Sequence, residues 1–213
     1  MLALFDLDNT LIDRNGGLES WARDFARSRR LGEGATAVIC ERLRERTYPA
    51  DFVHLRETLG LDDAPGDLWQ EYVDGVARSV RCFPGVLEGL EGLRAEGWTL
   101  GVATNGAADV QRAKLAATGL APFFEGICIS EEVGVRKPAY AHFKAAATLC
   151  GRRLGSGGWM VGDKPETDIG GARVAGLRSV WVAGGRTWAD GLPEPDVVVP
   201  GVVEAIGVMR AAA

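Results

Sequence analysis

The feature that most constrains the fold is the alternation of short apolar runs with helical patterns from residue 82 to the end of the chain. Short apolar runs bounded by polar turns are typical of strands that are buried on both faces. We expect strands at 98–103, 126–130, 158–162, 179–183 and 197–199, and helices at 83–96, 108–118, 138–150, 168–175 and 202–209. Strands that alternate with helices predict a mostly parallel sheet covered by helices on both faces.

One more expected strand, Leu2–Phe5, lies far from the others in the sequence. Between it and residue 82 the apolar residues recur at helical spacing, with breaks near 32–34, 48–49 and 62–66, which predicts about four amphipathic helices. A block of helices between the first and second strands indicates an insertion into the sheet domain. The predicted class is therefore α/β: a Rossmann-like three-layer core with a parallel sheet and an inserted helical-bundle cap.

The predicted domain boundaries follow from this pattern. Residues 1–14 and 82–213 form the expected Rossmann-like core, and residues 15–81 form the expected helical insertion, which the resemblance described below identifies with a catalytic core and its helical cap domain. Helices that each carry one apolar stripe can pack into a small bundle with a core of its own.

Composition excludes several classes of protein. The net charge is −5 with both signs mixed along the chain, which argues against a nucleic-acid binder. The four cysteines are scattered without a Cys-x-x-Cys pair, which indicates a reducing cytoplasm and no zinc site. We expect no secretory signal, no membrane span and a cytoplasmic location. The oligomeric state is left open.

Polar side chains follow the expected strands at their carboxyl ends. They are Asp6 and Asp8, then Thr104 and Asn105, then Asp163 and Asp168, with Lys137 at the start of a helix. The carboxyl ends of parallel strands share one edge of a sheet, so these groups should converge. Two carboxylates so close raise each other's pKa unless a cation lies between them, which favours a hard metal ion such as Mg²⁺. Each residue taken alone also has an ordinary explanation as a turn former, helix cap or exposed lysine.

Four motifs, in order, resemble those of the haloacid dehalogenase superfamily. They are Asp6-Leu7-Asp8-Asn9-Thr10 after an apolar strand, Ala103-Thr104-Asn105-Gly106, Lys137-Pro138, and Gly162-Asp163 with Asp168 five positions later. The resemblance covers residues 1–14 and 82–200. In that family a helical cap lies between the first and second motifs, and the expected helical insert occupies the same place.

The resemblance implies a Mg²⁺-dependent phosphatase that forms an aspartyl-phosphate. Asp6 would attack phosphorus, and Asp8 would protonate the leaving alcohol and then activate water. Mg²⁺ would be held by the Asp6 carboxylate, the Asp8 backbone carbonyl and Asp163.

The remaining motif residues would bind the phosphate. The Thr104 hydroxyl, Lys137 and backbone N–H groups that include that of Asn105 would contact its non-bridging oxygens. Asp168 would stand behind these groups, where it holds a metal-bound water or orients Lys137.

Asp8 separates activities within the resemblance. Haloacid dehalogenases typically lack an acid at this position, because a halide leaving group needs no proton. Asp8 therefore favours a phosphoryl-transfer reaction over dehalogenation. A phosphomutase remains open, as does a regulatory protein that binds phosphate and Mg²⁺ without turnover. The expected partner is a small phosphorylated metabolite, and its identity is left open.

Overall fold

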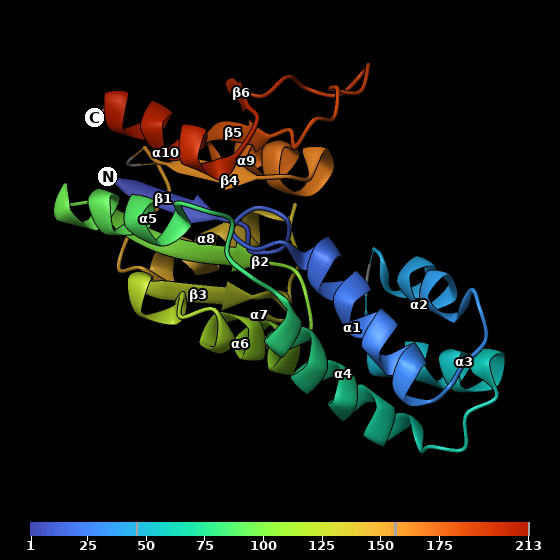
Figure 1. The fold of residues 1–213 in the computed structure, drawn as a ribbon. Coiled ribbons are helices and arrows are strands. Elements are labelled where there is room, and N and C mark those ends of the chain that lie inside the picture. The colour runs from blue at the N-terminus through green and yellow to red at the C-terminus, as the bar shows by residue number, and fades with distance from the viewer. Residues whose placement is uncertain (46, 156, 213) are drawn as a thin grey trace. The chain divides into compact units, whose positions relative to one another are not determined.

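The computed structural model describes residues 1–45, 47–155 and 157–212, and it separates into two compact units. The core unit consists of Met1–Ile12, Cys82–Asn105 and Gly119–Ala213. The helical unit consists of Asp13–Arg81 and Gly106–Thr118. Figure 1 shows the strands in the core unit and the long helices of the helical unit.

The core unit contains a six-stranded sheet in the order β3-β2-β1-β4-β5-β6, with every neighbouring pair parallel. The strands are β1 Leu2–Phe5, β2 Thr99–Thr104, β3 Gly126–Ile129, β4 Trp159–Gly162, β5 Arg178–Val182 and β6 Val197–Val199. The predicted parallel sheet is confirmed. All residues of β1, β2 and β4 are buried, because their continuous apolar runs pack on both faces of the sheet.

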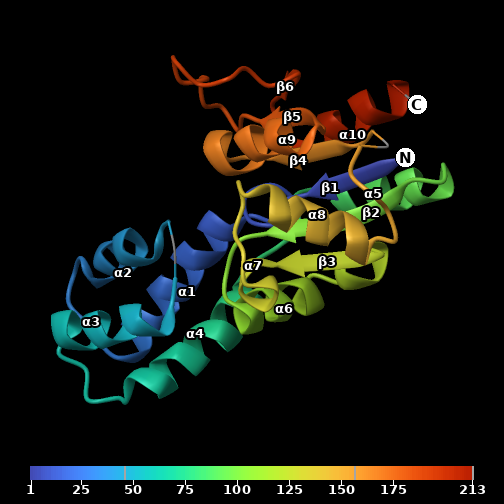
Figure 2. The same cartoon turned by 180° about the vertical axis from the view of Figure 1, so that it is seen from behind.

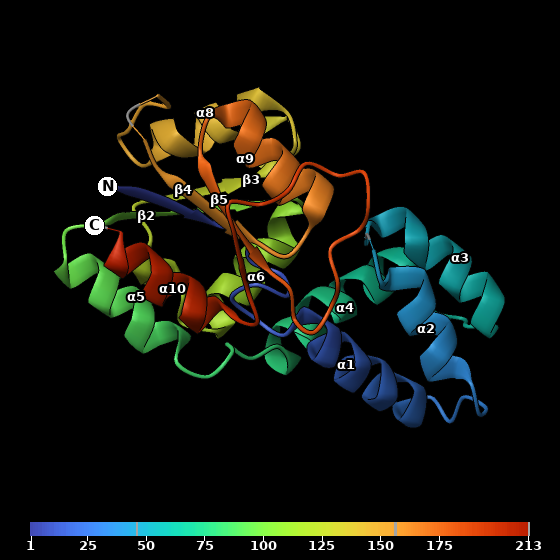
Figure 3. The same ribbon diagram turned by 90° about the horizontal axis from the view of Figure 1, so that it is seen from above.

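Helices cover both faces of this sheet. Helices α8 (Tyr140–Leu149) and α9 (Gly170–Ala175) lie on one face, and α5 (Val86–Ala95) and α10 (Val202–Ala211) lie on the other (Figure 3). The view in Figure 2 shows α8 beside β1 and β2, which it contacts. The expected three-layer, Rossmann-like architecture is therefore confirmed.

The helical unit is built from α1 Arg14–Ser28, α2 Ala35–Leu43, α3 Pro49–Leu59, α4 Pro65–Ser79 and α6 Ala108–Ala117. Local chemistry sets their ends. Asp13 caps α1 by accepting the Gly16 N–H at 2.8 Å, and prolines begin α3 and α4. Gly60 ends α3 in the left-handed region with φ 63°. None of the described helices has the length and apolar character needed to cross a membrane.

The helical unit has its own aromatic core. Tyr72 packs against Trp21, Phe52 and Trp69, with ring centroids 5.0–5.7 Å apart. The Trp69 Nε1–H donates to Asp109 Oδ2 at 2.7 Å, which ties α6 to α4. The predicted core range includes residues 108–118, which the structure groups with the helical unit.

Candidate active site

Asp6 occupies the carboxyl end of the central strand. Its N–H donates to the Val161 carbonyl at 2.9 Å, which continues the pairing of β1 with β4 and fixes its position on the sheet edge. The chain then turns sharply, since the Leu7 carbonyl accepts the N–H of Leu11 at 3.0 Å and Asn9 adopts φ 58°. Asn tolerates this left-handed conformation better than most residues. Asp6 is buried and Asp8 is half-buried.

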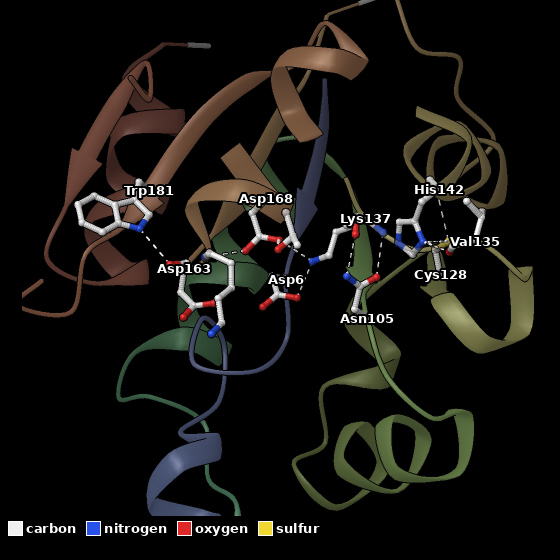
Figure 4. Close-up of polar contacts among 11 residues, drawn as sticks. Asp6, Asn105, Cys128, Val135, Lys137, His142, Asp163, Asp168 and Trp181 are labelled. Atoms are coloured by element: carbon white, nitrogen blue, oxygen red, sulfur yellow. Dashed lines mark hydrogen bonds and ion pairs between the residues drawn. The ribbon is translucent and has the colours of Figure 1, made fainter. Parts of the chain in front are cut away.

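Lys137 joins two buried carboxylates. Its Nζ lies 2.7 Å from Asp6 Oδ1 and 2.7 Å from Asp168 Oδ1, and the residue is only 3% exposed. Figure 4 shows these three side chains pointing toward one another from separate parts of the chain: Asp6 follows β1, Lys137 precedes α8 and Asp168 precedes α9. The convergence of Asp6, Lys137 and Asp168 on one edge of the sheet is the geometry that the strand pattern predicts.

Asn105, just beyond β2, fixes the backbone of Lys137. The Asn105 Oδ1 accepts the Lys137 N–H at 2.9 Å, and its Nδ2 donates to the Lys137 carbonyl at 3.1 Å (Figure 4). The side-chain amide is therefore used to position the lysine. The predicted phosphate contact from Asn105 involves its backbone N–H and stays a prediction. Thr104, one residue earlier, is buried at the same strand end.

Asp168 lies in a π-helical turn, Pro165–Ile169, that precedes α9. Its Oδ2 accepts the Lys164 N–H at 3.0 Å, so the carboxylate caps this turn from inside it. A Cβ added to Gly162 would meet Asp168 Oδ2 at 2.3 Å, so the glycine of the fourth motif makes room for this carboxylate. The other oxygen of Asp168 contacts Lys137, and the predicted role of Asp168 in orienting that lysine stays a prediction.

Asp163 follows β4 and brings a third buried carboxylate to the site. Ligand oxygens of Asp6, Asp163 and Asp168 all lie within 4.8 Å of one another. The Asp163 Oδ1 is buried and has no hydrogen-bond partner among the described residues. A buried carboxylate oxygen without a partner is costly, and a hard cation bound to it would remove that cost. The donor set therefore fits Mg²⁺.

The electrostatics of the site also favour a bound cation. Burial raises the pKa of Asp6 to about 8, although Lys137 lowers it, and the Asp168 and Asp163 charges raise it further. Burial and the Asp168 charge likewise raise the pKa of Asp163 to about 6. Burial lowers the pKa of Lys137, but Asp168 and Asp6 outweigh burial and raise it above its usual value. Lys137 and Arg186 form ion pairs with these three carboxylates, and their two positive charges are fewer than the three negative charges present when all three are ionised.

Two buried residues at the site have no separate sequence motif. The Trp181 Nε1–H donates to the Asp163 carbonyl at 3.0 Å, and His142 Nδ1 lies 2.9 Å from the Val135 carbonyl in the segment before Lys137 (Figure 4). Burial lowers the pKa of His142 to about 4, so the ring is neutral and supports this segment. For Trp181, the sequence offers one signal: a tryptophan in an apolar strand has a buried indole N–H that needs a hydrogen-bond acceptor.

Comparison with known proteins identifies the family. Residues 3–182 match the model of haloacid dehalogenase-like hydrolases. The chain is 35% identical over 178 residues to the phosphoserine phosphatase of Thermus thermophilus, covering 82% of this chain and 68% of that protein. It is 32% identical over 213 residues to the glyceraldehyde 3-phosphate phosphatase of Methanopyrus kandleri, covering 92% of this chain and 89% of that protein.

A solved structure agrees with these sequence comparisons. The 2-haloacid dehalogenase from Pseudomonas syringae pv. tomato superposes with a TM-score of 0.70 at 30% identity, covering 100% of this chain and 99% of that one. The Rossmann-like α/β core, the carboxylate cluster at its sheet edge and the match over residues 3–182 together define the class of protein as a hydrolase. The chain belongs to the haloacid dehalogenase-like hydrolase family, as its motifs predict.

Proposed function

We propose that the protein is a Mg²⁺-dependent phosphatase that hydrolyses a small phosphomonoester through an aspartyl-phosphate. One observation carries the proposal: Asp6 is held by the Lys137 ammonium at 2.7 Å and lies beside the unpartnered oxygen of Asp163. This arrangement combines a fixed carboxylate nucleophile with groups that can bind a phosphate and a cation. The phosphatase names of the two curated relatives support the same reaction class.

Two carboxylates divide the bond changes. An Asp6 carboxylate oxygen attacks phosphorus, the bond from phosphorus to the leaving oxygen breaks, and Asp8 gives that oxygen its proton. Asp8 then takes a proton from water as the water oxygen attacks phosphorus. The bond from phosphorus to Asp6 breaks, which releases phosphate and restores the Asp6 carboxylate.

The chain's other polar groups bind the phosphate and the metal. The Lys137 ammonium, the Thr104 hydroxyl and the Asn105 backbone N–H are proposed to contact the non-bridging oxygens. Asp6, Asp163 and the Asp8 backbone carbonyl are proposed to hold Mg²⁺. When bound, Mg²⁺ supplies positive charge that offsets the repulsion between the phosphate and the carboxylate nucleophile.

Asp168 completes this assignment from a position behind Lys137. Its carboxylate orients the ammonium that contacts Asp6, at 2.7 Å on each side. The helical unit is proposed to act as the cap that selects the leaving group, as the family resemblance implies. We also propose a cytoplasmic location, as the scattered cysteines of the sequence predict.

The similarity to a 2-haloacid dehalogenase makes dehalogenation the rival reaction. Asp8 argues against it, because displacement of halide from carbon needs no proton donor at the leaving group. The test therefore offers p-nitrophenyl phosphate and 2-chloropropionate side by side, each with Mg²⁺ and with EDTA. We expect phosphate release that needs Mg²⁺ and no chloride release.

Variants of Asp6 and Asp8 then test the role proposed for each carboxylate. Asp6→Asn should abolish phosphate release, because an amide oxygen is a far weaker nucleophile. Asp8→Asn should lower kcat by about 10²–10⁴-fold, the usual contribution of general acid–base catalysis. Asp190→Asn, an exposed aspartate of the core unit, is the matched control and should match the wild type. An Asp6→Asn enzyme with full turnover would contradict the covalent mechanism.

A further inference from the structure

Two oxygens of Asp163, its backbone carbonyl and one carboxylate oxygen, contact side chains that follow or belong to β5. Its carbonyl oxygen accepts the Trp181 Nε1–H at 3.0 Å and an Arg186 Nη2–H at 2.9 Å. Its Oδ2 lies 3.3 Å from Arg186 Nη1. The remaining oxygen, Oδ1, is buried without a partner among the described residues. One carboxylate oxygen of Asp163 therefore forms an ion pair with the exposed Arg186 side chain, and the other has no partner among the described residues.

Arg186 is itself fixed by the backbone around it. Its Nε–H donates to the Ala183 carbonyl at 2.9 Å, and its Nη2 also donates to the Val182 carbonyl at 3.0 Å. Its guanidinium carbon lies 5.7 Å from the centre of the Trp181 ring. Because the guanidinium is a rigid planar fork, these contacts fix the direction of the N–H groups that face Asp163.

The other two carboxylates of the cluster are restricted in the same way. Asp6 Oδ1 is bound to Lys137, which leaves one oxygen of Asp6 for a cation. Asp168 uses Oδ1 for Lys137 and Oδ2 for the Lys164 N–H. Asp6 and Asp163 therefore each present one carboxylate oxygen to a cation, and neither presents an open bidentate carboxylate.

This pattern discriminates between divalent cations. Ca²⁺ takes more oxygen ligands and readily binds carboxylates through both oxygens, whereas Mg²⁺ needs near-octahedral geometry from single oxygens and waters. We propose that Arg186 holds Asp163 to single-oxygen coordination and thereby makes this site prefer Mg²⁺ to Ca²⁺. Arg186 is a positioning residue in this proposal, which rests on the metal site of the proposed function.

The positive charge of Arg186 also affects cation binding, and this effect must be distinguished from that of its guanidinium geometry. A nearby cation repels Mg²⁺ and Ca²⁺ alike, because both carry the same charge. Removing the charge alone would tighten the binding of both ions by a similar factor. Removing the fork should instead change the ratio of the two affinities, so this ratio is the quantity to measure.

The experiment measures the dissociation constants of Mg²⁺ and Ca²⁺ by titration calorimetry on the full chain, without substrate. In Arg186→Gln the freed Asp163 Oδ2 should let Ca²⁺ bind through both oxygens. We expect the ratio of the Ca²⁺ to the Mg²⁺ dissociation constant to fall by about tenfold, the lower end of the usual effect of residues behind metal ligands. Arg186→Lys keeps the charge without the fork and should shift the ratio in the same direction.

Arg173→Gln removes an exposed arginine from α9 in the same unit and should leave the ratio unchanged. Thermal unfolding of each variant shows whether it is folded before titration. If Arg186→Lys keeps the wild-type ratio while Arg186→Gln changes both affinities equally, charge is responsible and the inference fails. A wild type that binds neither ion would instead overturn the Mg²⁺ dependence of the proposed function. Calorimetry distinguishes this outcome from failure of the inference about Arg186.

Discussion

Replacing Lys137 with methionine tests the central ion pairs of the site. The substitution keeps a long unbranched side chain but removes the ammonium that lies 2.7 Å from both Asp6 and Asp168. Those carboxylates are 6% and 0% exposed, so water cannot take the place of the lysine. Removing one partner of a buried ion pair typically lowers the free energy of unfolding by about 3–5 kcal/mol.

The cost of this substitution should depend on pH. Without Lys137, the pKa of Asp6 rises beyond its already raised value of about 8, because Lys137 is the group that lowers it most. The native state then keeps a proton that the unfolded chain releases above about pH 4. The wild type and the variant both lose stability as pH rises from about 4 to about 8, but only the variant continues to lose it above pH 8. Its deficit relative to the wild type should therefore be larger at pH 8.5 than at pH 5.

Urea denaturation at these two pH values, in EDTA, measures the deficit. Lys144→Met, at an exposed lysine of α8, is the matched control and should stay within about 0.5 kcal/mol of the wild type. Phosphate release by Lys137→Met should fall by about 10²–10³-fold, the usual effect of losing one donor to the transition state. The reasoning is refuted if Lys137→Met unfolds like the wild type at pH 8.5, or if its deficit is larger at pH 5.

Two further predictions concern the carboxylate cluster. In the metal-free wild type, the raised pKa values of Asp6 and Asp163 should make stability fall from about pH 4 to about pH 8, by about 1.4 kcal/mol per pH unit for each retained proton. Melting temperatures in EDTA and in Mg²⁺ check this, and a metal-free protein that gains stability over this range would contradict it. Gly162→Ala should displace Asp168 and cost about 1–3 kcal/mol, because the new methyl group would lie 2.3 Å from a carboxylate oxygen. Chemical denaturation with a parallel phosphatase assay measures both effects, and unchanged values would mean that the turn moves freely.

The sequence predicts the core of this protein because its signals are local. Each buried strand is a continuous apolar run, and the polar residue at its end is adjacent in sequence, so Asp6, Thr104 and Asp163 could be placed on one edge. The parallel arrangement then brings these ends together without any knowledge of side-chain contacts. The prolines and the Asp13 cap likewise mark the starts of helices from neighbouring residues alone.

The features of the site that the sequence does not predict depend on contacts between residues far apart in the chain. Arg186 lies in an irregular segment after β5, and its bond to Asp163 crosses 23 residues. The Asn105 amide meets the Lys137 backbone across 32 residues, so the motif identified the position but not what its side chain does. The π-helical turn around Asp168 is set by its bond to Lys164, which does not follow from residue types.

The central position of β1 has a consequence for how the chain folds. Its two neighbours pair with it through Leu2↔Thr99 and Ala3↔Trp159, so both partners are made long after β1 itself. Pairings of such large sequence separation form slowly, because a long loop must close before the contacts are gained. A nascent chain that has not yet reached β4 carries an apolar strand with an unpaired edge, which is prone to aggregation. The strand that leads to Asp6 is thus made before both of its neighbours and is among the last to be completed.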